Sequence, residues 1–210
     1  MLTLYTAPTG NGRKPTLLLK LLNLDYKLNQ FEWPTTEIKQ EWYLKLNPNG
    51  TIPTLVDGDL TLYESNAILE YISENYDKDL KFTYSKGSIN YWLIHQWLFY
   101  QSSNFAGTMS QTNRYLKYNP NDEWSRNVLL NDWIKIYTVL DGHLKKNKSG
   151  WFVGDKFTIA DLALAVGNHR RVEKTTGTKY EIEKFDENFP NVKKWYDRVL
   201  EIEGVKDILN

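Results

Sequence analysis

The sequence predicts an α/β domain over residues 1–78 and an all-helical domain over residues 88–210, joined by a linker at 79–87. Apolar patterns typical of strands and of helices alternate through the first part. The pattern breaks in the polar stretch YDKDLKFTYSKG, and every apolar pattern after it has helical spacing. A chain of this length can bury two small cores or one larger one.

In the first domain, leucines at helical spacing predict the first helix, in which Pro15 is tolerated only within the first turn. Asp57-Gly58-Asp59 is the turn of a predicted hairpin. The predicted strands are Leu2–Thr6, Tyr26–Phe31, Thr54–Val56 and Leu60–Tyr63, and the predicted helices are Asn11–Leu24, Glu37–Leu46 and Ser65–Tyr76. The order β-α-β-α-β-β-α is that of a thioredoxin fold.

The second domain is predicted to be a bundle of helices. The stretch NYWLIHQWLFY is apolar on nearly every face, as a central buried helix would be. Trp124–Leu144 carries a helical apolar stripe, and Val192–Leu200 shows a last amphipathic helix. Thr158 and Asp161 fit a capping box before the apolar LALAV run, so we assign both to stability and not to catalysis.

Charge and composition exclude several classes of function. Lys+Arg and Asp+Glu are equal at 26 each, so no excess of positive charge favours nucleic acid or an acidic membrane as a partner. No apolar stretch is long enough to span a bilayer and the N-terminus lacks a signal pattern, so we expect a soluble, cytoplasmic protein. Cysteine is absent, which excludes disulfides and a cysteine nucleophile, and the three histidines lack metal-ligand spacing, so no metal is expected.

The segment NPNGTIPTLVDGDLTLYESNAILEYI carries the strongest indication of function. Pro53 precedes a strand and exposes the backbone of its neighbour Ile52, and a cis peptide bond there would make a fixed turn. Ser65 suits the N-cap of the following helix, whose free N–H groups and partial positive charge attract a carboxylate. The segment predicts a site for a peptide-like anion; the alternative is a purely structural hairpin and capped helix.

The NPNGxIPxLVD…ESxAILxYI run resembles the glutathione-binding half of the cytosolic glutathione transferases, and the resemblance covers almost the whole chain. It implies a thioredoxin-like domain with a cis Pro53, glutathione as the co-substrate, and no metal. The cysteinyl backbone of the ligand is then expected to pair with Ile52, and its γ-glutamyl end to lie at Glu64 and Ser65. Family members that use their own cysteine are excluded, because this chain has none.

The TAPTxNGxK stretch after the first strand resembles the loop of the bacterial nu-class transferases and of the fungal branch typified by the yeast nitrogen-catabolite regulator. The resemblance implies that Thr9 and Asn11 approach the glutathione sulfur as catalytic residues. Asn11, at the start of a helix, offers donors to a thiolate but no base for its proton, so it would act by electrostatic stabilisation. The alternative is that both residues only cap the helix.

One position departs from the nu-class pattern within the expected glutathione-binding segment Thr51-Ile52-Pro53. Thr51 stands where that pattern often has a Lys or Arg that reaches the glycyl carboxylate. A different cation must therefore hold this end, or the affinity is weaker. The possible substitutes are Arg13, Lys14, Lys39 and Lys45.

The second substrate is expected in the cleft between the domains. The stretch around WLFYQ is similar to the fungal relatives, but Asn104 and Thr108 replace an expected glycine and proline. The candidates for the cleft are Phe105, Met109 and Arg114. Core packing is the alternative for the first two.

The expected function is that of a glutathione transferase whose bound thiolate attacks a small-molecule electrophile, a disulfide or a peroxide, in detoxification or disulfide reduction. The resemblance also implies a homodimer. The alternatives are a glutathione-binding regulatory or carrier protein with little catalysis, and the transferase-like domain of translation elongation factor gamma. The yeast regulator's Asn/Gln-rich arm and the elongation factor's extra domain are both absent from this sequence, which favours a stand-alone enzyme.

Overall fold

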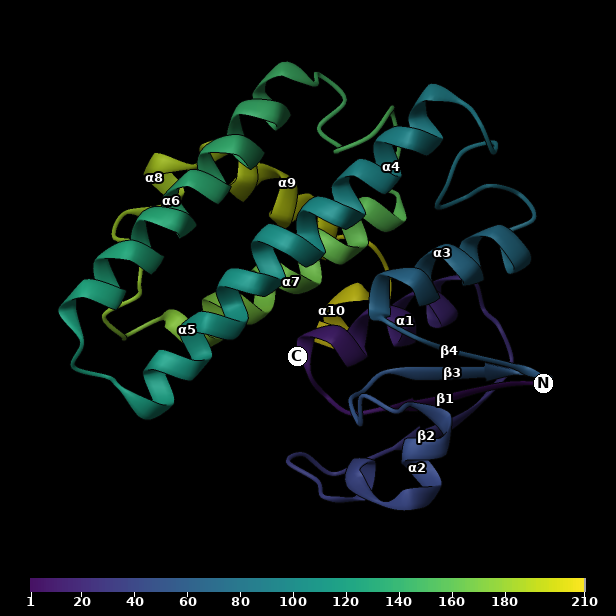
Figure 1. Cartoon of the computed structure of the whole chain (residues 1–210). Coiled ribbons are helices and arrows are strands. Elements are labelled where there is room, and N and C mark those ends of the chain that lie inside the picture. Colours follow the sequence, from purple (N-terminus) through teal and green to yellow (C-terminus); the bar gives the residue numbers. More distant parts are fainter. Residues whose placement is uncertain (210) are drawn as a thin grey trace.

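The structure is a computed structural model that describes residues 1–209. A four-stranded sheet with its helices forms the N-terminal part, and a bundle of helices forms the rest (Figure 1). The N-terminal elements are β1 (Leu2–Thr6), α1 (Gly10–Leu21), β2 (Tyr26–Gln30), η1 (Glu37–Lys39), α2 (Glu41–Leu46), β3 (Thr54–Asp57), β4 (Leu60–Tyr63) and α3 (Ser65–Tyr76). The later elements are α4 (Ile89–Tyr100), η2 (Gln101–Ala106), α5 (Gly107–Tyr118), α6 (Glu123–Lys146), α7 (Ile159–Thr175), α8 (Phe185–Asn188), α9 (Pro190–Leu200) and α10 (Val205–Leu209).

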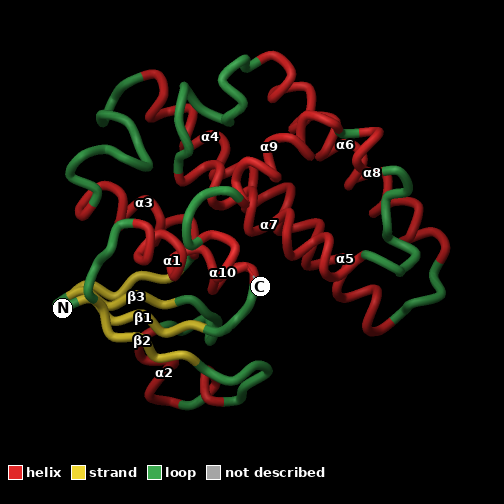
Figure 2. The backbone as a smooth tube through the Cα atoms, turned by 180° about the vertical axis from the view of Figure 1, so that it is seen from behind, coloured by secondary structure: helices red, strands yellow, loops and turns green. Residues whose placement is uncertain are grey.

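The strand order of the sheet is β2-β1-β3-β4. β1 pairs in parallel with β2, while β3 runs antiparallel to both β1 and β4. Helices α1 and α3 cover one face of the sheet and α2 lies on the other, which both views show (Figures 1 and 2). The predicted thioredoxin-like order followed by a helical domain is therefore confirmed.

Two predicted helices differ from the observed ones. The stretch 37–46 is divided, because Gln40 is extended with ψ 153° and separates η1 from α2. Helix α1 begins at Gly10 and ends at Leu21, so Pro15 lies beyond the first turn in which it was expected. Pro15 has no N–H for the carbonyl of Asn11, yet the helix continues through this buried residue.

The helical part is built around α7, whose LALAV run is fully buried, as predicted. The capping box of Thr158 and Asp161 is present at its N-terminus. Helix α7 packs against both α1 and α4, so the two parts of the chain share one continuous core. A short helix α10, which the sequence pattern did not predict, follows α9 and packs against α1.

A π-helical segment, η2, joins α4 to α5. Within it Gln101 and Phe105 are buried, while Ser102, Ser103 and Asn104 are exposed. The segment therefore turns two of its side chains towards α1, α6 and α7. Wide turns of this type are frequent at functional sites.

Candidate functional site

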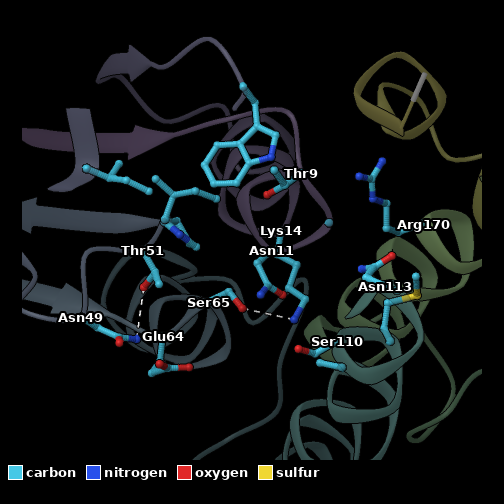
Figure 3. Close-up of a pocket in the computed structure, with 18 of the residues that line it drawn as sticks. Thr9, Asn11, Lys14, Asn49, Thr51, Glu64, Ser65, Ser110, Asn113 and Arg170 are labelled. Atoms are coloured by element: carbon cyan, nitrogen blue, oxygen red, sulfur yellow. Dashed lines mark hydrogen bonds between the residues drawn. The ribbon is translucent and has the colours of Figure 1, made fainter. Parts of the chain in front are cut away.

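A cavity of about 680 Å³ lies between the two parts of the molecule. Its walls come from the start of α1, the loop before β3, the start of α3, the η2–α5 region and α7 (Figure 3). The volume is in the range typical of small-molecule sites. The cavity brings together residues that are far apart in the sequence, including Asn11, Ser65 and Arg170.

The Ile52-Pro53 peptide bond is cis, which confirms the expectation from the motif. The loop before it is held from behind, since the Thr51 carbonyl accepts hydrogen bonds from Tyr43 Oη at 2.7 Å and from Asn47 Nδ2 at 2.8 Å. Among the described residues, none pairs with the backbone N–H or C=O of Ile52. These two groups are free to pair with a peptide-like ligand in the cavity.

The start of α3 differs in one detail from its prediction. Glu64, and not Ser65, occupies the N-cap, with a left-handed φ of 74° and no side-chain capping bond. Ser65 is instead the first helical residue, is buried, and lines the cavity. Because no side chain caps α3, the N–H groups of its first turn stay available to an anion.

Lys14 of α1 lies directly beside Ser65 (Figure 3). Its ammonium donates to Ser65 Oγ at 3.2 Å, Asn66 Oδ1 at 3.0 Å and Gln101 Oε1 at 2.7 Å. Burial lowers the pKa of Lys14 to about 7, against the opposing field of Glu64. The sequence singled out Lys14 only as a possible glycyl-end cation, and the structure places it at the opposite, Ser65 end.

The two predicted catalytic residues flank the first turn of α1. Thr9 is the N-cap, and its Oγ1 accepts a hydrogen bond from the N–H of Gly12 at 3.2 Å; its hydroxyl hydrogen has no acceptor among the described residues. Asn11 lines the cavity with an exposed side chain that bonds to no other described side chain or backbone group. Gly12 lets the turn approach β1, because a Cβ there would lie 2.2 Å from the Ala7 carbonyl oxygen.

Of the four candidate cations for the glycyl end, Lys39 is the one placed near Thr51. Its Nζ donates to the carbonyl of Gly50 at 2.7 Å, and the side chain lines the cavity. Lys45 instead pairs with Glu41 on the surface. Arg13 lies 3.8 Å from Glu173 and does not line the cavity.

In the η2–α5 region, Phe105 and Met109 line the cavity although both are largely buried. Phe105 also packs against Trp133 in the core, with ring centroids 4.9 Å apart. Arg114 is exposed and is not among the residues that line the cavity.

Arg170 of α7 also lines the cavity, and sequence reasoning missed it. Its guanidinium is 2.6 Å from Glu173, and its aliphatic stem lies against Gly10. Figure 3 shows Arg170 and Asn113 on the side of the site formed by the later helices. The next residue, Arg171, is buried among the aromatic rings of Trp133, Tyr137 and Phe185.

Neither a membrane span nor a metal cluster is found within residues 1–209, the part of the chain that the structure describes. None of their helices is long and apolar enough to cross a membrane. No group of three or more His, Asp or Glu side chains among them is arranged to hold a metal ion.

Comparison with known proteins identifies the family. The model of the glutathione S-transferase N-terminal domain matches residues 11–75, and that of the C-terminal domain matches residues 108–210. Glutathione S-transferase 2 of Schizosaccharomyces pombe is 34% identical over 97% of this chain and 93% of its own. A disulfide-bond oxidoreductase of Escherichia coli is 28% identical over 95% of this chain and 90% of its own. The chain belongs to the glutathione S-transferase family.

Solved structures agree with this assignment. A glutathione S-transferase-like protein of Lodderomyces elongisporus has a TM-score of 0.93 at 44% identity, covering 100% of this chain and 95% of its own. A second homologue from that organism, crystallised with two glutathione molecules per subunit, has a TM-score of 0.87 at 34% identity, covering 99% and 97%. A glutathione transferase of Phanerochaete chrysosporium in complex with oxidised glutathione has a TM-score of 0.89 at 32% identity, covering 99% and 94%.

Proposed function

We propose that this protein is a glutathione transferase that binds glutathione in the cavity and uses its thiolate against a second small molecule. One observation carries the proposal: a single cavity collects the free backbone of Ile52, the uncapped start of α3 at Ser65, and Asn11 at the start of α1. Each of these suits a different part of the tripeptide. Family membership and the glutathione-bound neighbours support the same ligand.

The proposed placement runs along the loop. The cysteinyl N–H and C=O pair with the backbone of Ile52, as a short added strand would. The γ-glutamyl end lies at Glu64 and Ser65, where the carboxylate meets the free N–H groups of α3. The glycyl carboxylate lies near Thr51, with Lys39 as its cation in place of the expected basic residue.

Thiolate formation is assigned to the start of α1. A free cysteine thiol has a pKa near 8.5, and lowering it by about two requires roughly 2.7 kcal/mol of preference for the thiolate. The amide of Asn11, the hydroxyl of Thr9 and the partial positive charge of α1 all favour the charged sulfur. None of them removes the proton, so the site acts by stabilising the thiolate electrostatically.

Two reactions follow from a bound thiolate. In conjugation, the sulfur forms a bond to an electrophilic carbon and a leaving group departs with the bonding electron pair. In disulfide reduction, the sulfur forms a mixed disulfide and the other sulfur leaves as a thiolate; a second glutathione then completes the exchange. Two similar proteins favour disulfide reduction as one of the reactions. One is the neighbour that binds oxidised glutathione, and the other is the disulfide-bond oxidoreductase of Escherichia coli.

We also propose domain bounds, a cellular location and a biological role, which family membership alone does not establish. The division into domains at 1–78 and 88–210 is supported by the gap between the end of α3 at Tyr76 and the start of α4 at Ile89. A cytoplasmic location and a role in detoxification are consistent with glutathione as co-substrate. Peroxides are further candidates for the second substrate.

A homodimer is proposed from the outer face of α4. Ile89, Trp92 and Phe99 lie on one side of this helix and are 79%, 63% and 68% exposed. A second copy of the chain would cover them. Light scattering on the purified protein should give twice the mass of one chain, and Trp92→Glu should give a monomer; a monomeric wild type would contradict the proposal.

The first test of the proposed function is a glutathione titration at about pH 7, where most free thiol is protonated. Thiolate ultraviolet absorbance is followed together with the heat of binding. Saturable binding with a growing thiolate signal supports an enzyme that activates glutathione. Binding without that signal would support the carrier or regulatory alternative, and no binding would contradict both.

A further inference from the structure

Among the described residues, Lys14 is a buried lysine without an anionic partner. Its side chain is 2% exposed, and all three acceptors around Nζ are neutral: a hydroxyl and two amide oxygens. No ion pair within 4.0 Å connects Lys14 to any described carboxylate. A buried charge of this kind is costly unless an opposite charge compensates it.

The cavity is the side from which that opposite charge can come. Lys14 lines the cavity together with Glu64 and Ser65, and the free N–H groups of α3 open onto the same region. A carboxylate placed there meets a cation, a hydroxyl and a helix N-terminus at once. Glu64 acts on Lys14 through its field, but its side chain is exposed and does not contact the ammonium.

The contact between Lys14 and Ser65 also determines where the hydroxyl hydrogen of Ser65 points. In its charged form the lysine has only donors, so Ser65 Oγ accepts in this hydrogen bond whenever Lys14 is protonated. The hydroxyl hydrogen of Ser65 is then available for a different acceptor, and the cavity is where that acceptor lies. Lys14 thereby converts Ser65 into a donor for an anion.

We propose that Lys14 is the counter-charge for the α-carboxylate of the γ-glutamyl end, and that it orients the Ser65 hydroxyl towards that carboxylate. The inference rests on the proposed function, because it assumes glutathione in this cavity. It adds a positioning residue that selects for a free α-carboxylate. A γ-glutamyl group that lacks this carboxylate should therefore bind poorly.

A purely structural role for Lys14 makes a different prediction. Asn66 Nδ2 already donates to the Leu98 carbonyl at 2.8 Å and to Gln101 Oε1 at 3.0 Å, which ties α3 to α4 and η2 without the lysine. If Lys14 only added to this anchor, its removal would lower stability and weaken all ligands alike. A dependence on the α-carboxylate separates the two roles.

The experiment compares glutathione with its analogue γ-aminobutyryl-cysteinyl-glycine, which lacks only the α-carboxylate, by calorimetry on the full chain. Wild type should lose affinity for the analogue by on the order of 10- to 100-fold, as for a lost charge-assisted hydrogen bond. In Lys14→Met and in Lys14→Gln this penalty should shrink by on the order of tenfold, because the charge pair is gone while Ser65 and the N–H groups of α3 still contact the carboxylate. Lys14→Gln keeps a polar side chain in case the methionine variant fails to fold.

Lys39→Met is the matched control, since it removes a cation from the other end of the same cavity. It should keep the full wild-type penalty for the missing α-carboxylate. The inference is overturned if both Lys14 variants keep that penalty, or if wild type itself binds the two ligands equally. Failure of wild type to bind glutathione at all would contradict the proposed function instead.

Discussion

Tyr43 donates its hydroxyl hydrogen to the carbonyl of Thr51 at 2.7 Å, directly before the cis Ile52-Pro53 bond. Asn47 supplies a second donor to the same oxygen, and both side chains are fully buried. The loop that offers its backbone to the ligand is thus supported from the core and not from the cavity.

Tyr43→Phe tests this support. We expect a loss of about 1–2 kcal/mol in the free energy of unfolding, because the contacts to Thr51 and Thr54 disappear while Asn47 still reaches both. Adding Asn47→Ala should cost more than the sum of the single changes, since the Thr51 carbonyl then has no partner. Denaturant unfolding of the three variants measures this; strict additivity would show that the two donors act independently.

Asn11→Ala tests thiolate stabilisation. The pKa of bound glutathione should rise, because the amide donor is lost, while glutathione affinity stays within a few-fold. Thiolate absorbance measured across pH gives the pKa, and an unchanged value would remove Asn11 from the mechanism. Thr9→Ala is the comparison variant. Besides removing a hydroxyl donor to the sulfur, it should lower the free energy of unfolding by about 1 kcal/mol, because α1 loses its cap.

Ser65→Ala tests the γ-glutamyl end. Glutathione binding should weaken by about 1–2 kcal/mol, as for the loss of one hydrogen bond to a charged group. Calorimetric titration of the variant against wild type is the measurement. Full affinity in Ser65→Ala would place the ligand elsewhere in the cavity.

Asp161→Ala separates stability from function. This buried carboxylate accepts from the N–H of Phe152 at 2.9 Å, the N–H of Thr158 at 3.0 Å and the indole Nε1 of Trp195 at 2.9 Å. Leaving these buried donors unpaired should cost about 3 kcal/mol or more. Unfolding by denaturant should show this loss, while the folded variant keeps wild-type glutathione affinity; a loss of affinity in the folded protein would contradict the structural assignment.

Lys14 should also make stability depend on pH. Burial lowers its pKa from 10.5 to about 7 in the folded, ligand-free protein, whereas the unfolded chain keeps the ordinary value. Between these two values the unfolded state binds more protons, so the free energy of unfolding rises with pH there, by at most about 1.4 kcal/mol per pH unit. The stability that the folded protein gains by holding Lys14 uncharged is present at high pH and is lost as the pH falls through about 7.

The measurement is the difference in unfolding free energy between wild type and Lys14→Met from pH 7 to 10. Wild type should gain on the variant as the pH rises, because the variant has no titrating group at this position. Glu64, the charged residue that acts on Lys14, is present in both proteins and cancels from the difference. A difference that is flat across this range would mean that Lys14 keeps an ordinary pKa.

The sequence predicted the order of strands and helices because each element has its own apolar period. It also located the loop at Pro53 and the start of α3. The role of Lys14 was not predictable, since its partners Ser65 and Gln101 lie 51 and 87 residues away along the chain. The same holds for Arg170, which reaches the cavity only because α7 packs on α1.

Local ambiguity explains the remaining differences. Glu64 and Ser65 are adjacent polar residues, and only the left-handed φ of Glu64 decides which of them caps α3. The apolar stretch before Gln101 and the polar stretch after it both fit a regular helix, so the wide turn of η2 was invisible in the pattern. In the folded chain the first residue of η2, Gln101, accepts a hydrogen bond from Lys14, a contact between distant residues that the local sequence pattern does not show.

The π-helical segment η2 changes the angular phase between α4 and α5. Each residue of a regular helix advances the side-chain direction by about 100°, so one residue more or fewer within 101–106 rotates all of α5 relative to α4. Met109, Ser110 and Asn113 would leave the cavity together, whereas Lys14 and Ser65 would stay. An insertion or deletion within η2 would therefore change the side chains that face the second substrate. The residues proposed to hold the γ-glutamyl end would keep their positions.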